Sequence, residues 1–212
     1  MAAVDANIRE IPYGDSRFTL DRGCLPGTRV AFLNFILDWV NNPDSERILV
    51  FFGLAGTGKS SIAHEIARRF DEMDRLTSCC FFVRKEQSKT EAYHLFTNLA
   101  HDLVDRYPLF KAALGEIIKD KTSLRRSTRD YDTLFRRLIL DPLRDVPVVG
   151  PILVIIDALD ESGDTANEGG LHTFLANNLS ALPSTSVYLS PRGRRVASSL
   201  RSLPRIRSSS KT

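Results

Sequence analysis

Residues 48–61 read Ile-Leu-Val-Phe-Phe-Gly-Leu-Ala-Gly-Thr-Gly-Lys-Ser-Ser, an unbroken apolar run that passes into a glycine-rich turn. An apolar run without alternation is typical of a strand covered on both faces, as in a parallel sheet. The turn, residues 53–60, fits the pattern G-x-x-x-x-G-K-[ST], and Ile62, Ile66 and Phe70 after it share one face of a helix. A buried strand, a glycine-rich turn and an amphipathic helix together predict a phosphate-binding loop.

Each fixed position of this loop has a chemical role toward a nucleoside triphosphate. Glycines let the backbone N–H groups point at phosphate oxygens, and the N-terminus of the next helix adds donors and a positive dipole end. Lys59 is expected to reach the β- and γ-phosphates, and the Ser60 hydroxyl to ligate Mg²⁺. The residues expected to hold the nucleotide here are Gly53, Leu54, Ala55, Gly56, Thr57, Gly58, Lys59, Ser60 and Ser61.

A second apolar run, residues 152–156, ends in the acidic sequence Asp157-Ala158-Leu159-Asp160-Glu161. The carboxyl end of a central parallel strand faces the crevice in which open α/β sheets bind ligands. We therefore expect Asp157 to hold Mg²⁺, directly or through water. Asp160 or Glu161 is expected to polarise the water that attacks the γ-phosphate, the alternative being that one of them caps the following loop.

Strand-like runs alternate with helical periodicity along the rest of the chain. Further strands are predicted near residues 79–83 and 187–189, and helices over residues 28–42, 90–106, 109–119, 131–140 and 171–182. Thr28 is the expected N-cap of the first helix. Such alternation predicts βαβ units, and hence an α/β fold with a parallel sheet.

Composition agrees with one globular α/β domain, at 212 residues, 42% hydrophobic and 26% charged. No apolar run approaches the roughly 18 residues that span a membrane, and the first twenty residues lack an apolar signal region. The three cysteines and four histidines show no metal, disulfide or catalytic spacing. We expect a cytoplasmic chain with no membrane partner.

Positive charge is concentrated at one end of the chain. Residues 192–212 hold seven basic residues and no acidic one, so the remainder is net acidic. A basic run of this kind is expected to be a solvated terminus, the alternative being attraction to nucleic acid or anionic lipid. Nucleic acid is not an expected partner.

Three segments, in order, carry a family resemblance. They are Cys24-Leu25-Pro26-Gly27-Thr28-Arg29 before a helix, the glycine-rich loop, and Asp157-Ala158-Leu159-Asp160-Glu161. Together they resemble the NACHT-type domains of STAND-class P-loop NTPases, in particular the nephrocystin-like N-terminal NTPase region of fungal NLR-like proteins. The resemblance implies a three-layer, ASCE-type parallel sheet flanked by helices, in which the strand at Val187 separates the two motif strands. It also implies that residues 27–29 lie near the nucleotide base.

The same resemblance suggests limits and departures. It covers roughly residues 20–207, and the nucleotide-binding domain is expected over 24–207. Residues 1–23 lack a clear period and are expected to form an irregular lead-in, and residues 208–212 a disordered tail. The family's C-terminal winged-helix region is lacking, so the chain looks truncated. Arg192 stands where family members end a strand in T-S-R-P, but its setting, Leu189-Ser190-Pro191-Arg192, differs. The resemblance implies that it senses the γ-phosphate, the alternative being an arginine of the tail without such a role.

The implied activity is binding of Mg²⁺ with ATP, or GTP, and slow hydrolysis as the nucleotide switch of an NLR-like signalling protein. ATP is favoured because the chain lacks the [NT]-K-x-D segment of guanine-specific proteins. Self-association, or association with other NLR-like chains, is the implied protein partnership. The alternative is a non-hydrolysing fragment that acts as an interaction module or decoy.

Overall fold

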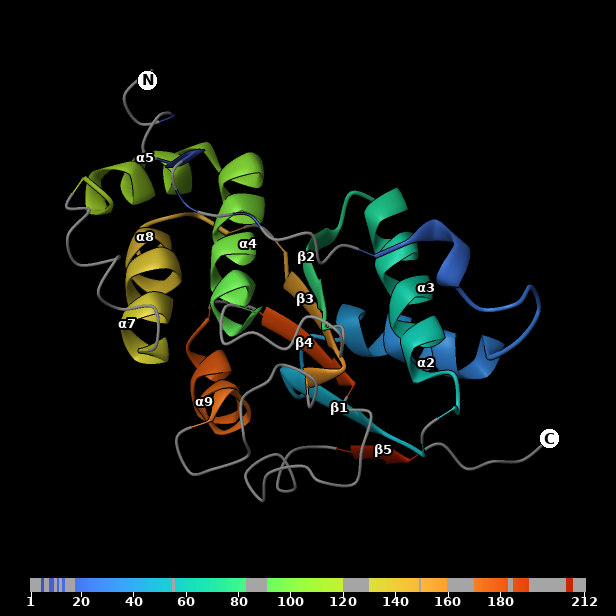
Figure 1. The fold of residues 1–212 in the computed structure, drawn as a ribbon. Coiled ribbons are helices and arrows are strands. Elements are labelled where there is room, and N and C mark those ends of the chain that lie inside the picture. The colour runs from blue at the N-terminus through green and yellow to red at the C-terminus, as the bar shows by residue number, and fades with distance from the viewer. Residues whose placement is uncertain are drawn as a thin grey trace.

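Helices lie on both faces of a five-stranded sheet in the computed structural model (Figure 1). None of the helices in the described residues has the length and apolar character that a membrane crossing requires. The structure describes residues 5, 8–9, 11, 13, 18–54, 56–82, 91–119, 130–148, 150–159, 170–182, 185–190 and 205–207.

Every neighbouring pair of strands in the sheet is parallel, and the strand order is β2-β3-β4-β1-β5. Val187 of β4 pairs with Ile48 of β1 on one side and with Val154 of β3 on the other. The predicted parallel sheet is confirmed, and so is the position of the Val187 strand between the two motif strands. The strands are β1 (Ile48–Phe52), β2 (Leu76–Phe81), β3 (Ile152–Asp157), β4 (Thr185–Ser190) and β5 (Arg205–Arg207).

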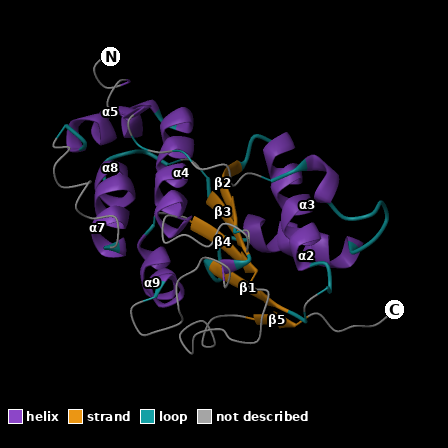
Figure 2. Cartoon of the chain, viewed as in Figure 1, coloured by secondary structure: helices purple, strands orange, loops and turns teal. Residues whose placement is uncertain are grey.

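Two groups of helices cover the sheet (Figure 2). One face is covered by α2 (Val30–Asn41) and α3 (Lys59–Glu72). The other is covered by α4 (Glu91–Arg106), α5 (Pro108–Ile117), α7 (Tyr131–Phe135), α8 (Asp141–Leu143) and α9 (Leu171–Asn178). Short 3₁₀ turns occupy Leu20–Arg22 and Leu179–Ala181.

The two cores explain why the motif strands are unbroken apolar runs. Ile48 and Val50 of β1 pack into the core beneath α4, whereas Leu49 and Phe51 pack into the core beneath α2 and α3. Successive side chains of a strand point to opposite faces, so a strand with helices on both sides buries every residue. Residues of β3 alternate between the two cores in the same way.

The start of α2 differs from the prediction. Thr28 is not the N-cap: its hydroxyl donates to the carbonyl of Leu25 at 2.6 Å, which closes a turn before the helix. The helix begins at Val30, and its N-cap is Arg29, held in the left-handed region at φ 58°. Thr28 therefore stabilises the turn that leads into the helix and does not cap the helix itself.

The predicted helix over residues 131–140 forms with a widened second half. Tyr131–Phe135 is α-helical, Arg136–Leu140 is π-helical, and Asp141–Leu143 returns to α-helix. Pro142 accounts for the change, because it has no N–H to offer the carbonyl four residues earlier and its ring crowds that carbonyl.

The basic segment is not wholly a solvated terminus. Residues Arg205–Arg207 form β5, which pairs with β1 through Val50 with Arg205 and Phe52 with Arg207. The predicted disordered tail, residues 208–212, lies outside the described residues. Strand pairing here depends on the available edge of β1, which the local sequence does not indicate.

His64 joins the lead-in to the helix after the glycine-rich loop. Its Nδ1 accepts a hydrogen bond from the backbone N–H of Thr19 at 3.1 Å, and its ring stacks on Phe81 with centroids 4.0 Å apart. The side chain is 4% exposed, and burial, followed by the charge of Arg22, lowers its pKa from 6.5 to about 4. His64 is thus a neutral, structural histidine.

A pH dependence of stability follows from His64. Between pH 6.5 and about 4 the unfolded chain binds a proton at this histidine while the folded chain does not, so the free energy of unfolding falls as the pH drops. Glutamine cannot titrate. The free energy of unfolding of a His64→Gln variant should therefore fall by up to about 3 kcal/mol less than that of the parent over this pH window. Chemical denaturation at pH 7 and pH 4 measures the difference. Equal losses in the two proteins would contradict it.

Candidate functional site

The glycine-rich loop joins the carboxyl end of β1 to the first turn of α3. Helix α3 begins at Lys59, and its N-cap is Gly58 at φ 81°, with Gly56 also left-handed at φ 80°. A side chain at either position would strain the backbone by about 1–2 kcal/mol. A Cβ added there would meet no atom within 4 Å, so the space beside these glycines is open. Glycine is therefore favoured at both positions by the backbone conformation and not by a lack of space.

Contacts from inside and outside hold the loop in shape. Both the backbone N–H and the hydroxyl of Thr57 donate to the carbonyl of Leu54, at 3.4 Å and 2.8 Å. From the lead-in, Arg29 Nη2 donates to the carbonyl of Thr57 at 3.2 Å. The segment predicted to lie near the nucleotide base therefore contacts the loop through Arg29. Its relation to a base stays a prediction.

Lys59 is buried at the start of α3, with 4% of its surface exposed. Its ammonium group donates to the carbonyl of Gly53 at 2.8 Å and to that of Leu54 at 2.9 Å. A buried ammonium group needs such acceptors, because burial without them is costly. The ammonium group that is predicted to bind the terminal phosphates is therefore hydrogen-bonded to the first two carbonyl groups of the loop. Ser60 and Ser61 follow in the first turn of the helix, both partly buried.

Asp157 is the last residue of β3 and is only 2% exposed. It pairs with Phe81 of β2 and Ser190 of β4, and its carbonyl accepts the N–H of Phe82 at 3.1 Å. The chain turns directly afterwards, since Ala158 has a left-handed φ of 56°. Because all strands are parallel, Asp157 and the glycine-rich loop both lie at the edge of the sheet formed by the carboxyl ends of the strands. Only β4 separates the strands that carry them.

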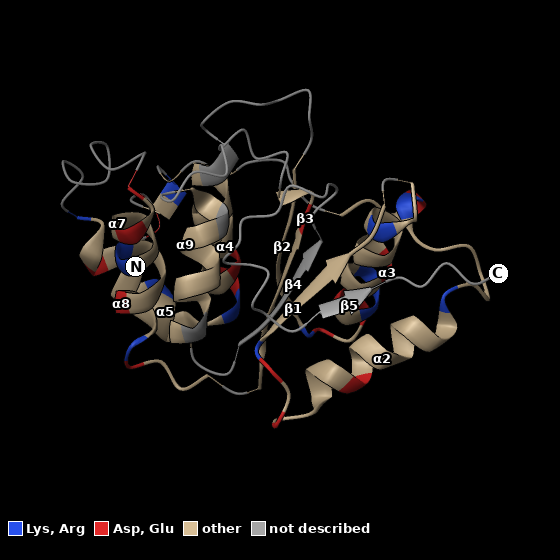
Figure 3. Ribbon diagram, turned by 90° about the horizontal axis from the view of Figure 1, so that it is seen from below, with Lys and Arg blue, Asp and Glu red and all other residues tan. Residues whose placement is uncertain are grey.

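The charge of Asp157 stands out in the sheet. Strands β1, β2 and β3 together carry one charged side chain, that of Asp157, whereas many charged residues lie on the helices (Figure 3). A carboxylate buried in such surroundings is costly unless it is paired or meets a cation. Strongly buried ionisable groups of this kind are concentrated at functional sites.

Oxygen donors at this edge suit Mg²⁺. The Ser60 hydroxyl and the Asp157 carboxylate are both hard oxygen ligands, which Mg²⁺ prefers. Within the described part of the chain, no three histidine, cysteine, aspartate or glutamate side chains are grouped to hold a metal ion. A Mg²⁺ ion here would thus rely on few protein ligands, as is usual where substrate phosphates and water complete the shell.

Four predicted site residues, Ala55, Asp160, Glu161 and Arg192, lie outside the described residues, and their roles stay predictions. The structure adds Arg29 as a residue in contact with the loop. Its signal in the sequence is weak, since it is an arginine directly before a helix, in a segment that the resemblance places near the nucleotide base.

A comparison with family models decides the relationship of the chain. The model described as "Nephrocystin 3, N-terminal" matches residues 28–190. The chain belongs to this family. The nephrocystin 3 N-terminal match includes the glycine-rich loop, Asp157 and all of β4, whereas the domain limits expected from the sequence stay predictions.

Other comparisons add little to the family. No curated protein matches the chain. Among solved structures, the Aeropyrum pernix ORC1 protein in complex with DNA is similar at a TM-score of 0.49 and 16% identity, over 87% of this chain and 45% of that one. This chain thus spans less than half the length of the ORC1 chain, and a likeness at this level does not bear on its ligands.

Proposed function

We propose that this chain binds ATP, or GTP, together with Mg²⁺ and hydrolyses it slowly, as the nucleotide switch domain of an NLR-like signalling protein. One observation carries the proposal: a glycine-rich loop leads into a helix N-terminus at the same edge of the sheet as a buried aspartate one strand away. The finer assignment, a NACHT-type, ASCE-class P-loop NTPase, is supported by the order β2-β3-β4-β1-β5, with β4 between the two motif strands.

Each residue of the site has a part in this function. The loop backbone and the first turn of α3 offer N–H groups to phosphate oxygens. Lys59 would exchange its bonds to the carbonyls of Gly53 and Leu54 for bonds to the terminal phosphates. Ser60 and Asp157 would hold Mg²⁺, which supplies charge neutralisation at the phosphates when bound. Arg29 keeps the loop in position through the carbonyl of Thr57.

The remaining assignments rest on the sequence. We propose that Asp160 or Glu161 orients the attacking water, and that Arg192 senses the γ-phosphate. Association with another copy, or with other NLR-like chains, is proposed as the route by which the nucleotide state would be passed on. Nucleotide binding without turnover would instead favour an interaction module.

A substitution of Lys59 tests nucleotide binding. Lys59→Ala removes the charge that meets the terminal phosphates, so the affinity for Mg²⁺–ATP should fall at least tenfold, about 1.4 kcal/mol. Isothermal titration calorimetry with ATP and with GTP measures this and also ranks the two nucleotides.

Two controls accompany this test. Lys119→Ala removes an exposed lysine that pairs with Glu116, so it should leave the affinity unchanged. Thermal unfolding establishes that both variants are folded. Equal ATP affinity in the parent and in folded Lys59→Ala would rule the proposed binding mode out.

A further inference from the structure

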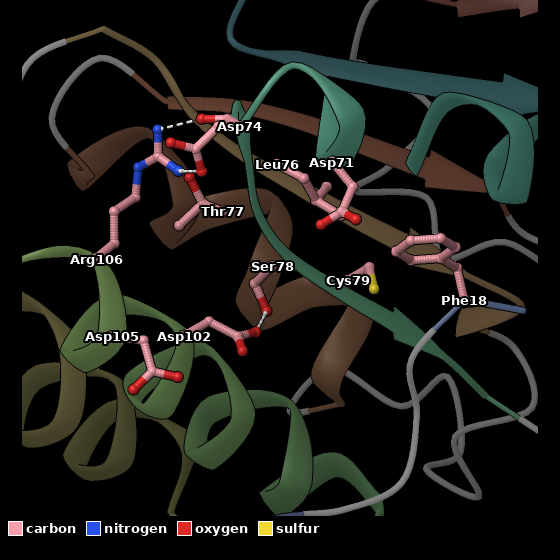
Figure 4. A pocket seen from close by; sticks show the side chains of 10 residues that line it. All are labelled: Phe18, Asp71, Asp74, Leu76, Thr77, Ser78, Cys79, Asp102, Asp105 and Arg106. Carbon is pink, nitrogen blue, oxygen red and sulfur yellow. Dashed lines mark hydrogen bonds and ion pairs between the residues drawn. The ribbon is translucent and has the colours of Figure 1, made fainter. Parts of the chain in front are cut away.

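A cleft of about 390 Å³ lies beside the outer strand β2 of the sheet (Figure 4). The amino-terminal half of β2 forms its floor, whereas the loop follows the carboxyl end of β1. Strand β2 is the outermost strand on this side, and in the described residues only β3 pairs with it. The residues that line this acidic edge cleft are Phe18, Asp71, Asp74, Leu76, Thr77, Ser78, Cys79, Asp102, Asp105 and Arg106.

The lining carries excess negative charge from two helices. Asp71 and Asp74 come from the end of α3 and the turn after it, and Asp102 and Asp105 from the last turns of α4. Arg106 is the single basic residue of the lining. Its guanidinium group already donates to the carbonyl of Asp74 at 2.7 Å and lies 3.5 Å from the Asp74 carboxylate. The cleft therefore has room for further positive charge.

A buried hydroxyl group in the lining points to a missing partner. Thr77 is 6% exposed, and within the described part of the chain its Oγ1 has no hydrogen-bond partner. The neighbouring hydroxyl of Ser78, by contrast, donates to Asp102 Oδ2 at 2.6 Å. An unsatisfied buried hydroxyl lowers stability, and a donor bound in the cleft would remove that cost.

The chemistry of the lining selects its occupant. Carboxylates and a hydroxyl oxygen accept hydrogen bonds from an ammonium or guanidinium group, and they repel phosphate and nucleic acid. The cleft does not group its acidic side chains as a metal site within the described residues. Arg106 shows how the recognition works, since its guanidinium binds a backbone carbonyl and a carboxylate at this same edge.

The edge position selects the shape of the occupant. An outer strand presents backbone N–H and C=O groups along its length, and extended peptides bind by lying along such an edge. The lining reaches over the edge of β2 to both α3 and α4, which leaves the strand itself at the centre of the cleft. We propose that the acidic edge cleft binds an extended, arginine- or lysine-bearing segment of a partner protein, with one basic side chain among the aspartates and close to Thr77.

A labelled peptide tests this proposal independently of nucleotide binding. The probe is a fluorescein-labelled nonapeptide of alternating arginine and threonine, and its control carries neutral citrulline in place of arginine. Fluorescence anisotropy at low ionic strength should show binding of the arginine peptide to the parent and to Lys59→Ala alike. Binding of the citrulline peptide with equal affinity, or no binding of the arginine peptide, would overturn the proposal.

Matched charge variants locate the site. The double variant Asp71→Asn, Asp105→Asn changes two exposed carboxylates of the cleft and should weaken peptide binding at least tenfold. The double variant Asp44→Asn, Asp145→Asn makes the same change of charge at exposed positions outside the lining and should bind as the parent does. Equal weakening in both would mean attraction to overall charge and would refute the assignment to this cleft.

Thr77→Val separates a binding role from a structural one. Valine has the same shape and removes the unsatisfied hydroxyl, so the melting temperature should stay the same or rise. Peptide affinity should nevertheless fall at least threefold, because the Thr77 hydroxyl of the parent makes its hydrogen bond only in the complex and valine cannot make it. Undiminished affinity in this variant would contradict the placement of the basic side chain beside Thr77.

Discussion

Replacing Asp157 with asparagine is expected to remove the gain in ATP affinity that Mg²⁺ provides and to slow hydrolysis at least a hundredfold. The side chain is buried at the end of β3, in a sheet whose β1, β2 and β3 hold no other charge. Asparagine keeps the shape but not the negative charge, so the ion loses its carboxylate ligand. A hundredfold loss is about 2.7 kcal/mol of transition-state stabilisation.

The test for Asp157 compares affinities with and without the metal ion. In EDTA, the parent and Asp157→Asn should bind ATP equally, and on addition of Mg²⁺ only the parent should bind more tightly. Phosphate release measures turnover in parallel. The same gain from Mg²⁺ in both proteins would show that Asp157 does not face the ion, and its burial would then have a purely structural cause.

The double variant Asp160→Asn, Glu161→Gln is expected to bind ATP and to release no phosphate. Both residues follow Asp157 closely, after the left-handed turn at Ala158. Hydrolysis in sites of this class depends on positioning and on charge, so loss of the carboxylate that orients water should reduce turnover far more than binding. Single-turnover assays with labelled ATP, beside calorimetry, measure the two effects separately.

The single variants then assign the role. One of Asp160→Asn and Glu161→Gln should reproduce the loss in the double variant, while the other should keep most of the activity. Unchanged phosphate release in the double variant would exclude both carboxylates as the base. A parent protein that binds ATP without any turnover would instead favour the interaction module.

Much of the fold could be predicted because its strongest signals are local. The apolar runs of β1 and β3 and the helical face of α3 each lie within one short stretch of sequence. Strand β5 could not be predicted in this way. Its three residues, Arg-Ile-Arg, have no strand signal of their own, and they pair because β1 presents an open edge far back in the chain.

For the candidate site, the sequence predicts which residues belong to it but not the contacts that they make. The motif gives the positions of Lys59 and Asp157, and parallel strands place both at one edge of the sheet. The bonds from Lys59 to the loop carbonyls and from Arg29 to Thr57 are set by tertiary packing and by one left-handed residue. Neither is encoded in the spacing of residues.

The pairing of β1 has a consequence for how the protein is made. Ile48 pairs with Val187 and Val50 with Arg205, so the strand that carries the glycine-rich loop acquires both its neighbours from the last part of the sequence. On the ribosome, β1 emerges well before β4 and β5, and until they follow it is an apolar strand with both edges unpaired. Such edges favour aggregation, and sheets built from distant segments form slowly. The nascent chain should therefore depend on chaperones until both β4 and β5 have been synthesised.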